Sequence, residues 1–404
     1  MRDSKLESRL PPLTRLADIL GLERSMVALL AMVVLVGLGE RLAERFLPIY
    51  LLALGAAIQL PGLLNAMDNL LSALYSFPGG YLSDRIGTKR ALLVFNLIAL
   101  LGYAIVIAFP SWWAVFLGSI FFLSWSAISL PASMSLVDKS LPRDRRTMGV
   151  SMHSLARRAP MALGPIVGGV LIDRFGTIDG IRLAFALAML LGLVSIAVQQ
   201  ILIEEEPAAH GQRAEANPLR VLRDMSSSLR SLLVADILVR FAEQIPYAYV
   251  VIWCLQNVGV GGLQFGLLTT IEMVTAALIY LPVAYLADRS RKKPFVVVTF
   301  GFFTLFPLLL LLSDSFALLA VAFVVRGLKE FGEPTRKALI MDLAPDGEKA
   351  AMFGAYYLVR DIVVAAAALS SGFLWRISPE ANLLTAAACG LAGTLFFARR
   401  GRDL

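Results

Sequence analysis

Long apolar stretches, separated by short polar segments, recur along almost the whole 404-residue chain. A helix that crosses the hydrocarbon core of a bilayer needs about 20 mostly apolar residues. Stretches of this length lie at 27–50, 57–81, 91–109, 112–136, 147–172, 181–202, 231–255, 263–286, 295–313, 315–340, 350–375 and 380–398. The pattern predicts an all-α, polytopic membrane protein with about twelve transmembrane helices. The first, seventh and tenth stretches contain charges and define their helices least clearly.

Composition agrees with this pattern and excludes an ordinary soluble domain. Hydrophobic residues make up 58% of the chain and charged residues only 17%, and the mean hydropathy is +0.73. Such values are far from those of globular soluble proteins. The bilayer is therefore an expected partner.

Lysine and arginine gather in alternate loops, which indicates orientation. The rich segments are 2–24, 85–90, 139–146, 213–223, 289–293 and 399–402, whereas the opposite loops offer little beyond Arg174, Arg182 and Arg376. Because cytoplasmic loops carry the positive excess, we expect both termini to be cytoplasmic and the protein to lie in an inner membrane. The formal net charge of +7 then reflects orientation, and no nucleic-acid partner is expected. The polar first 24 residues also predict no cleavable signal peptide.

An internal repeat relates the two halves of the chain. "NAMDNLLSALYSFPGGYLSDR" aligns with "TTIEMVTAALIYLPVAYLADR", which pairs Asp68 with Glu272. "RLAERFLPIYLL" aligns with "RFAEQIPYAYVV", which pairs Arg41 with Arg240. At one constant offset, Pro131, Pro142, Leu155, Arg157 and Gly169 pair with Pro334, Pro345, Leu358, Arg360 and Gly372. The repeat predicts two pseudo-symmetric six-helix bundles.

The repeat and one long polar segment divide the chain into parts. We predict a cytoplasmic N-terminal segment at 1–26, a bundle at 27–202, a linker at 203–230, a second bundle at 231–398 and a tail at 399–404. An even number of spans in each half gives both bundles one orientation in the membrane. Parallel repeats of this kind are typical of alternating-access transporters, whose site lies between the bundles near the midplane.

The polar loop "GGYLSDRIGTKR" interrupts this apolar chain at 79–90. Gly80 allows another helix to approach closely, and Gly87 can adopt the positive φ of a short turn. Arg85, Lys89 and Arg90 can anchor the loop at anionic headgroups. A contact made by Asp84 at a neighbouring helix N-terminus can form in one state and break in the other, so the loop is a candidate latch.

The pattern Gly80-x-x-x-Asp84-Arg85-x-Gly87-x-Lys89-Arg90 resembles the signature loop between helices two and three of the major facilitator superfamily. The twelve-span doubled architecture resembles that family over nearly the whole chain. The resemblance implies that Asp84 and Arg85 stabilise the outward-facing state by docking on the second bundle. The C-terminal copy of the motif is degraded, because Ala284 and Arg291 replace its glycines.

A second resemblance lies in "ALGPIVGG" at 162–169. Gly164-Pro165-x-x-Gly168-Gly169 is similar to the core of the helix-five motif of drug and metabolite antiporters in this superfamily, although Ser151 and Pro160 replace its upstream glycines. Pro165 is expected to bend the helix, and the glycines leave a bare stripe for close packing. The alternative is a tightly packed helix with no bearing on the direction of transport.

Ionisable side chains inside predicted spans are costly, so they are candidates for function. Arg41 with Glu44, and Arg240 with Glu243, are spaced three residues apart and share a helical face. We expect these four side chains to line the central cavity. The alternative is that each pair is only a satisfied ion pair beside it.

Asp68 and Glu272 are the candidate proton carriers. They occupy one repeat position and have no basic residue three or four positions away. Burial disfavours the charged form of a carboxyl group, which can then exchange protons near neutral pH. The alternatives are pairing with an arginine of another helix, or a wet position near the outer surface.

Arg157 and Arg360 also share a repeat position, and Asp361 follows Arg360. We expect the two guanidinium groups to face each other across the cavity, where they can hold an anionic group or clamp the carboxylates. The alternative is that both snorkel to the cytoplasmic surface.

The tenth helix is charged, and the fourth, its partner in the repeat, is not. "RGLKEFGEPTRKALIMD" carries both signs of charge, whereas "LSWSAISLPASMSLVD" is neutral until its last residue. We interpret the tenth helix as having a wet, charged face, with Glu330 and Glu333 as weaker coupling candidates. The fourth helix also lacks the embedded arginine that proton-coupled members of the superfamily often carry, which weakens the antiporter interpretation.

Motifs of other classes are missing from the sequence. It has no phosphate-binding glycine loop with its lysine, no HExxH and no GxSxG, so we expect neither an enzyme nor a cofactor. Cys254 and Cys389 are isolated, and His153 and His210 are the only histidines, so we expect no metal site.

We therefore predict a monomeric secondary transporter that works by alternating access. It exports a small amphiphilic or charged organic molecule in exchange for protons. The alternatives are organic-anion or nutrient uptake by a symporter or uniporter, and a lipid flippase.

Overall fold

The computed structural model describes residues 24–123, 125, 129, 133, 146–203, 223, 225–287, 291–343 and 349–402. Every regular element in this part of the chain is a helix. The first half contains α2 (Arg24–Glu44), α3 (Leu47–Ala53), α4 (Leu60–Ile86), α5 (Thr88–Ala108), α6 (Trp112–Phe122), α8 (Arg146–Phe175) and α9 (Thr177–Leu202). The second contains α11 (Ser227–Tyr247), α12 (Val250–Ile252), η3 (Trp253–Val258), α13 (Gly262–Ala287), α14 (Lys292–Leu311), α15 (Phe316–Leu328), α16 (Glu333–Leu343), α17 (Lys349–Ile377) and α18 (Pro379–Arg400).

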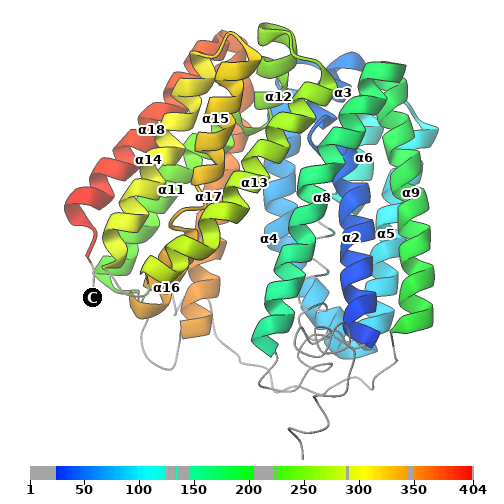
Figure 1. Cartoon of the computed structure of the whole chain (residues 1–404), viewed down its shortest axis with the longest axis horizontal. Coiled ribbons are helices and arrows are strands. Elements are labelled where there is room, and N and C mark those ends of the chain that lie inside the picture. Colours follow the sequence, from blue (N-terminus) through cyan, green and yellow to red (C-terminus); the bar gives the residue numbers. More distant parts are fainter. Residues whose placement is uncertain are drawn as a thin grey trace, which may run out of the picture.

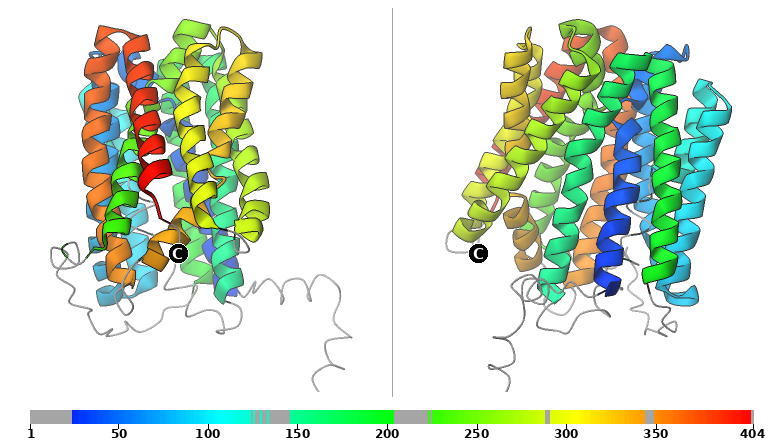
Figure 2. Two further views of the ribbon diagram at one scale, coloured as in Figure 1. Left: turned by 90° about the vertical axis from the view of Figure 1, so that its left-hand side faces the viewer. Right: turned by 45° about the vertical axis from the view of Figure 1, so that its right-hand side comes forward.

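These helices form two bundles, one from each half of the chain (Figure 1). In the first half, here the N-bundle, α2 packs against α8 and α9; in the second half, the C-bundle, α11 packs against α17 and α18. The long helices run between the same two ends of the molecule in all views (Figure 2). The predicted all-α, two-bundle architecture is thus confirmed.

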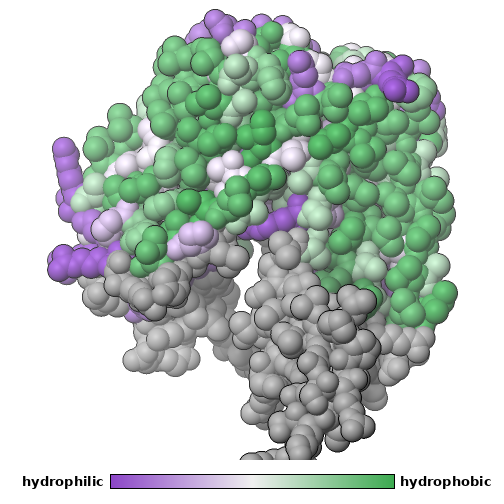
Figure 3. All heavy atoms as spheres, in the orientation of Figure 1, coloured by the Kyte–Doolittle hydropathy of each residue, from purple (hydrophilic) through white to green (hydrophobic). Residues whose placement is uncertain are grey.

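Length and composition identify membrane spans among these helices. Six are long and apolar enough to cross a bilayer, at Thr88–Ala108, Thr177–Leu202, Gly262–Ile279, Lys292–Leu311, Gly354–Ile377 and Pro379–Arg400. A seventh span results if α11 is joined to Val250–Val258 across a bend of 44°. Apolar residues cover most of the described surface in Figure 3, as expected of a protein surrounded by lipid.

The turn between α4 and α5 depends on Gly87. Its φ is 87°, a value that residues with a side chain rarely adopt, so the turn predicted here is confirmed. Arg85 and Arg90 are exposed beside it. The backbone of Gly80 and Asp84 lies in α4, but the surroundings of Gly80 and the side chain of Asp84 fall outside what the structure describes. The latch role remains a prediction.

The segment between the bundles also falls largely outside the described part. α9 ends at Leu202 and α11 begins at Ser227, so these limits are compatible with a linker at 203–230. Residues 204–222 within it are among those not described.

The bundles meet through α8 with α13 and through α4 with α17. A Cβ atom at Gly169 would lie 2.2 Å from the carbonyl oxygen of Gly262, and one at Gly62 would lie 2.9 Å from the amide nitrogen of Gly372. Only glycine permits such an approach of two backbones. All four glycines belong to the ends of their helices that lie away from the C-terminus of the chain, which we call the far side.

Polar and aromatic contacts close the far side as well. The carboxylate of Asp173 on α8 accepts hydrogen bonds from the backbone amides of Gly262 (2.7 Å) and Leu263 (2.9 Å), which begin α13. The hydroxyl of Tyr249 donates to the carbonyl of Ile58 at 2.7 Å, and its ring stacks on Trp375 at 4.6 Å. These contacts join the bundles at one end only.

At the opposite end, called the terminus side, the bundles separate. The chain's C-terminus and the beginning of α2 lie there, and α4 and α8 diverge from α13 and α17 (Figure 1). The described backbone contacts therefore hold the two bundles together at the far side.

Candidate functional site

A cavity lies between the bundles, just inside the contacts that close the far side. It encloses about 510 Å³ of empty space and is lined from α2, α4, α11, α12, α13 and α15. Its polar lining residues are Glu44, Arg45, Asn65, Asp68, Tyr247 and Arg326. Asn65 and Asn69 of α4 donate to the side-chain oxygen of Gln244 on α11, both at 3.1 Å, and join the bundles beside it. We call this space the interface cavity.

Asp68 lies in the wall of the interface cavity, two turns into α4. Its Oδ1 atom is buried without a hydrogen-bond partner. Among the described residues, none places a lysine or arginine nitrogen within ion-pair distance of this carboxyl group. The sequence-predicted proton carrier of the N-bundle is therefore a buried carboxyl without a counter-ion.

The Arg41–Glu44 pair lies on α2 beside Asp68. Arg41 Nη1 donates to Glu44 Oε1 at 2.7 Å, so the pair neutralises itself within its own helix. Arg45, one residue further, instead places its guanidinium 5.2 Å from the ring centre of Tyr247. Arg326 reaches the same ring at 5.8 Å, so Tyr247 lies between cationic groups of both bundles.

Glu272 occupies the position in α13 that repeats Asp68, but its surroundings differ. Its Oε1 atom lies 3.3 Å from Arg326 Nε and 3.3 Å from Lys329 Nζ. The side chain is completely buried. Glu272 therefore carries its charge between two cations, whereas Asp68 has none.

Glu272 is one end of an ion-pair network that runs through the C-bundle. Lys329 continues to Glu243 (2.8 Å), Glu243 to Arg240 (2.7 Å), and Arg240 to Glu333 (3.3 Å). The network then passes through Arg336 to Asp236 and ends at Arg360 and Asp361. Its acidic members are Asp236, Glu243, Glu272, Glu333 and Asp361, and its basic members are Arg240, Arg326, Lys329, Arg336 and Arg360. These ten members carry equal numbers of each sign, and the exposed Lys337 adds one more cation 3.5 Å from Glu333.

Arg360 is held inside this network and does not face Arg157. Its Nη2 lies 2.7 Å from Asp361 Oδ1, its Nη1 lies 3.6 Å from Asp236 Oδ2, and its guanidinium stacks 4.1 Å from the ring centre of Tyr357. Arg157 lines a separate pocket of the N-bundle. The expectation that the two guanidinium groups share one cavity is therefore wrong, because Asp236 and Asp361 hold Arg360 within its own bundle.

Three charges of the tenth helix, those of Arg326, Glu333 and Arg336, are buried, which corrects the interpretation of the whole helix as a wet face. Arg326, Glu333 and Arg336 are 4%, 8% and 1% exposed. They are paired within the C-bundle, and the helix is interrupted between α15 and α16 so that both signs of charge turn inward. Glu330 alone reaches the other bundle, at 3.9 Å from Arg158 on α8.

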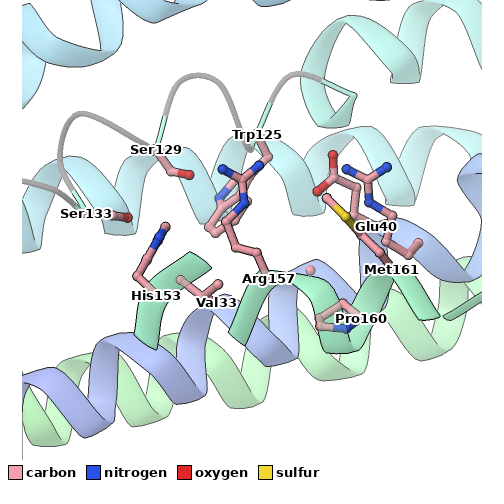
Figure 4. Close-up of a pocket in the computed structure, with 11 residues that line it drawn as sticks. Val33, Glu40, Trp125, Ser129, Ser133, His153, Arg157, Pro160 and Met161 are labelled. Atoms are coloured by element: carbon pink, nitrogen blue, oxygen red, sulfur yellow. The ribbon is translucent and has the colours of Figure 1, made fainter. Parts of the chain in front are cut away.

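A second pocket, here the N-bundle pocket, lies between α2, α8 and the segment that contains Trp125, Ser129 and Ser133 (Figure 4). Its lining includes Gly37, Glu40, Arg41, His153 and Arg157. His153 and Arg157 rise from α8, and Ser129 and Ser133 face them across the pocket (Figure 4). This polar pocket was not foreseen, because His153 and the serines carried no recognisable motif.

The glycines of the helix-five motif pack α8 against other helices. A Cβ atom at Gly164 would lie 2.6 Å from Arg41 Cβ, and one at Gly168 would lie 2.0 Å from the carbonyl oxygen of Leu42. Gly169 faces α13, as described above. α8 runs without interruption through Pro160 and Pro165. The motif thus sets the distance of α8 from α2 within its bundle and from α13 in the other.

The sequence-predicted residues therefore fall into separate groups. Glu44 and Asp68 share the interface cavity, and Arg41 and Arg157 share the N-bundle pocket. Arg240, Glu243, Glu272, Arg360 and Asp361 belong to the C-bundle network. The sequence missed Asp236, Tyr247 and His153, although Asp236, a charge inside a predicted span, was a signal that could have been used.

Metal binding has no support in the described part of the chain. No group of three or more histidine, cysteine, aspartate or glutamate side chains there could hold an ion. The site is built from ion pairs, single charges and aromatic rings.

Two bundles related by a repeat and a charged cavity between them are the features of an alternating-access transporter. The sequence model of the Major Facilitator Superfamily matches residues 29–241 and 232–403. The chain belongs to the Major Facilitator Superfamily, and the predicted resemblance is confirmed.

Relatives of known name are distant and match only part of the chain. One is the tetracycline resistance protein, class E, of Escherichia coli, 23% identical over 244 residues, which are 59% of each chain. Another is a multi-drug resistance efflux pump PmrA homolog of Lactococcus lactis, 24% identical over 216 residues, or 52% of each chain. The chain thus spans less than two thirds of the length of these relatives.

Solved structures share the fold over nearly the whole chain. The nucleoside transporter NupG superimposes with a TM-score of 0.78 at 12% identity, covering 95% of this chain and 100% of that one. At this identity the likeness concerns the fold alone.

Proposed function

We propose that this transporter is a proton-coupled exporter of a small charged or amphiphilic organic molecule, with Asp68 as its proton carrier. The observation that supports this most strongly is the setting of Asp68: a carboxyl in the wall of the interface cavity, with a buried oxygen that lacks a partner. An unpaired carboxylate is costly in a dry site and acceptable in a wet one. Opening and closing of the cavity would therefore favour release and uptake of a proton.

The direction of transport is inferred from two further observations. The distribution of lysine and arginine supports a cytoplasmic terminus side. The helices α4 and α8 diverge from α13 and α17 on that side (Figure 1), as expected of a state that loads a cytoplasmic substrate. The two relatives above are named for tetracycline resistance and for multidrug efflux. Both names support export. At 23% and 24% sequence identity they do not identify the substrate, which the experiment below tests.

Glu272 has a different part in this proposal. Because Arg326 and Lys329 already neutralise it, it exchanges a proton only if those cations move away. We assign proton transfer to Asp68 and assign to Glu272 the anchoring of α15 against α13. Asp84 and Arg85 are proposed, from the loop motif alone, to stabilise the opposite, outward-open state.

Transport by purified protein in proteoliposomes tests the proposal. The vesicles carry a pH-sensitive dye, and the probes are tetracycline, ethidium and p-aminohippurate, which represent a zwitterion, a cation and an anion. Wild-type protein is expected to accumulate at least one probe against its gradient when protons flow the opposite way. Asp68→Asn should abolish this accumulation and keep exchange of labelled for unlabelled probe.

Asp179→Asn is the matched control, because Asp179 lies at the exposed start of α9, 3.9 Å from Arg182 and away from the cavity. It should behave as wild type. Two results contradict the proposal. In the first, probe transport by wild-type protein does not depend on the pH gradient. In the second, Asp68→Asn protein still accumulates the probe when protons flow the opposite way. The first result favours a facilitator, and the second moves coupling to another group.

A further inference from the structure

The N-bundle pocket contains polar groups that have no hydrogen-bond or ion-pair partner among the described residues. His153, Ser129 and Ser133 are 3%, 3% and 1% exposed, and Arg157 extends beside them (Figure 4). In the part of the chain that the structure describes, none of these four side chains makes a hydrogen bond or an ion pair. Buried polar groups are normally satisfied, so three of them beside the guanidinium group of Arg157 indicate a site that receives a ligand.

The internal repeat indicates what that ligand is. The register that pairs Arg157 with Arg360 also pairs His153 with Tyr356 and Ser133 with Arg336. The register that pairs Arg41 with Arg240 pairs Gly37 with Asp236. The C-bundle therefore contains a filled version of the same arrangement, in which an aspartate replaces a glycine.

In that filled version, the three side chains converge on one carboxylate. The hydroxyl of Tyr356 donates to Asp236 Oδ2 at 3.0 Å, and Arg360 Nη1 lies 3.6 Å from the same atom. Arg336 completes the group with an ion pair to Asp236. In the N-bundle, the equivalents of all three side chains line the pocket together with Gly37. The pocket thus repeats the surroundings of the Asp236 carboxylate, but the residue aligned with Asp236 is Gly37, which carries no carboxylate.

We propose that the N-bundle pocket binds a carboxylate group of the transported molecule, with Arg157 as its counter-ion and His153 and Ser133 as hydrogen-bonding partners. This inference rests on the proposed transport function and narrows its substrates to organic anions and zwitterions. The carboxylate of Glu40 lines the same pocket. Its charge disfavours a doubly charged anion such as phosphate, so a single carboxylate is the better fit.

Binding to the purified, detergent-solubilised full chain tests the proposal. The probes are benzoate, its neutral analogue benzamide, and inorganic phosphate and sulfate, and the readouts are the unfolding temperature and calorimetric titration. Benzoate is expected to raise the unfolding temperature of the wild type in a saturable manner, and benzamide is not. An equal response to benzoate and benzamide in wild type overturns the proposal without any variant, and a response to phosphate and sulfate that exceeds that to benzoate overturns the carboxylate assignment.

Variants then locate the binding. Arg157→Gln should reduce the affinity for benzoate at least tenfold, whereas Arg158→Gln, a loss of the same charge one residue further along α8, should retain it. Gly37→Asp should abolish benzoate binding, because it supplies the carboxylate that Asp236 supplies in the other bundle. Unchanged benzoate affinity in Arg157→Gln overturns the proposal.

Gly37→Ala separates the carboxylate from the volume added. A Cβ atom at Gly37 would lie 3.2 Å from Pro160 Cγ, so the alanine variant reports the cost of this contact alone. Gly37→Asp is expected to unfold at a higher temperature than Gly37→Ala, since its charge neutralises Arg157. An aspartate variant less stable than the alanine variant, with benzoate still bound, counts against the proposal.

The two proposals fail separately. If benzoate binding depends on Arg157 but the protein shows no proton-driven transport, the export proposal is contradicted and the carboxylate-site proposal is supported. If transport depends on Asp68 but the protein does not bind benzoate and Arg157→Gln has no effect, the export proposal is supported and the carboxylate-site proposal is contradicted.

Discussion

Arg157 and Arg360 hold the same position in the two halves of the repeat, as do Asp68 and Glu272, yet the two bundles treat these charges differently. In the C-bundle, Arg360 has two aspartates and Glu272 has two cations. In the N-bundle, neither Arg157 nor Asp68 has a counter-ion among the described residues. The difference originates in α15 and α16, whose charges fill the C-bundle, while Trp125, Ser129 and Ser133 occupy the corresponding region of the N-bundle.

This contrast suggests a division of labour. A neutral, fully paired network costs little beyond its desolvation and holds the helices of its bundle in one arrangement. Single charges are costly unless a proton or a ligand compensates them. Under the proposals above, the network holds the C-bundle in one arrangement, and the N-bundle carries the groups that bind the proton and the substrate.

The largest test of the contrast removes Arg336, which is 1% exposed and binds both Asp236 and Glu333. Breaking a buried pair on one side costs about 3–5 kcal/mol, because the remaining charge stays buried. Arg336→Leu should therefore unfold at a markedly lower temperature. Ser133→Ala, at the equivalent position, should change the unfolding temperature little; similar losses in both variants would end the distinction between the bundles.

The two repeat-related carboxyls should respond with different signs. Glu272→Gln leaves Arg326 and Lys329 with one counter-charge fewer, and we expect a loss of about 3 kcal/mol, at the lower end of the range for broken buried pairs. Asp68→Asn removes an unpaired charge and should leave the unfolding temperature unchanged or raise it. A stabilised Glu272→Gln protein would show that the network does not hold the C-bundle together.

The two repeat-related arginines give a smaller test of the same kind. Arg360→Gln loses charge-assisted contacts with Asp236 and Asp361, worth about 1.5–3 kcal/mol. Arg157→Gln loses none within the described structure and should be neutral or stabilising. The measurement is the unfolding temperature of both variants without added ligand. A lower unfolding temperature for Arg157→Gln alone would contradict the assignment of unpaired charge to the N-bundle.

The smallest expected effect comes from a contact between the two bundles, not from a contact within one bundle. Asp173 caps α13 from the opposite bundle, and loss of a helix cap costs about 1 kcal/mol. Asp173→Ala should shift the equilibrium roughly fivefold toward the state in which the far side opens, since 1.4 kcal/mol corresponds to about tenfold. Spin-label distances across the terminus side measure the shift, and Asp179→Ala serves as the control. Unchanged distances in Asp173→Ala would show that the cap does not hold the far side closed.

Sequence patterns predicted most of the fold but only part of the candidate site. The repeat placed Asp68 with Glu272 and Arg157 with Arg360, and spacing placed Arg41 beside Glu44 and Arg240 beside Glu243. These relations depend on contacts within one helix or on register. Which groups pair across helices depends on rotation and tilt, and no sequence spacing encodes these.

The tenth helix illustrates the limit. Its run of charges predicts a wet face when it is counted along one helix. In the folded bundle, however, Arg326, Lys329, Glu333 and Arg336 pair with opposite charges from α11 or α13. Sequence spacing could not reveal the role of Asp236 for the same reason, because its partners Arg336 and Tyr356 lie 100 and 120 residues away along the chain.

The sequence by itself determined that this protein is a doubled bundle of apolar helices with its charges at repeated positions, because hydropathy and register are local properties of the chain. Only the tertiary structure decided which of those charges are neutralised, since a buried charge is compensated by whatever side chain another helix brings within a few ångströms. Among the described residues, the fold gives Asp68 and Arg157 no ion-pair partner in one bundle and pairs their counterparts, Glu272 and Arg360, in the other.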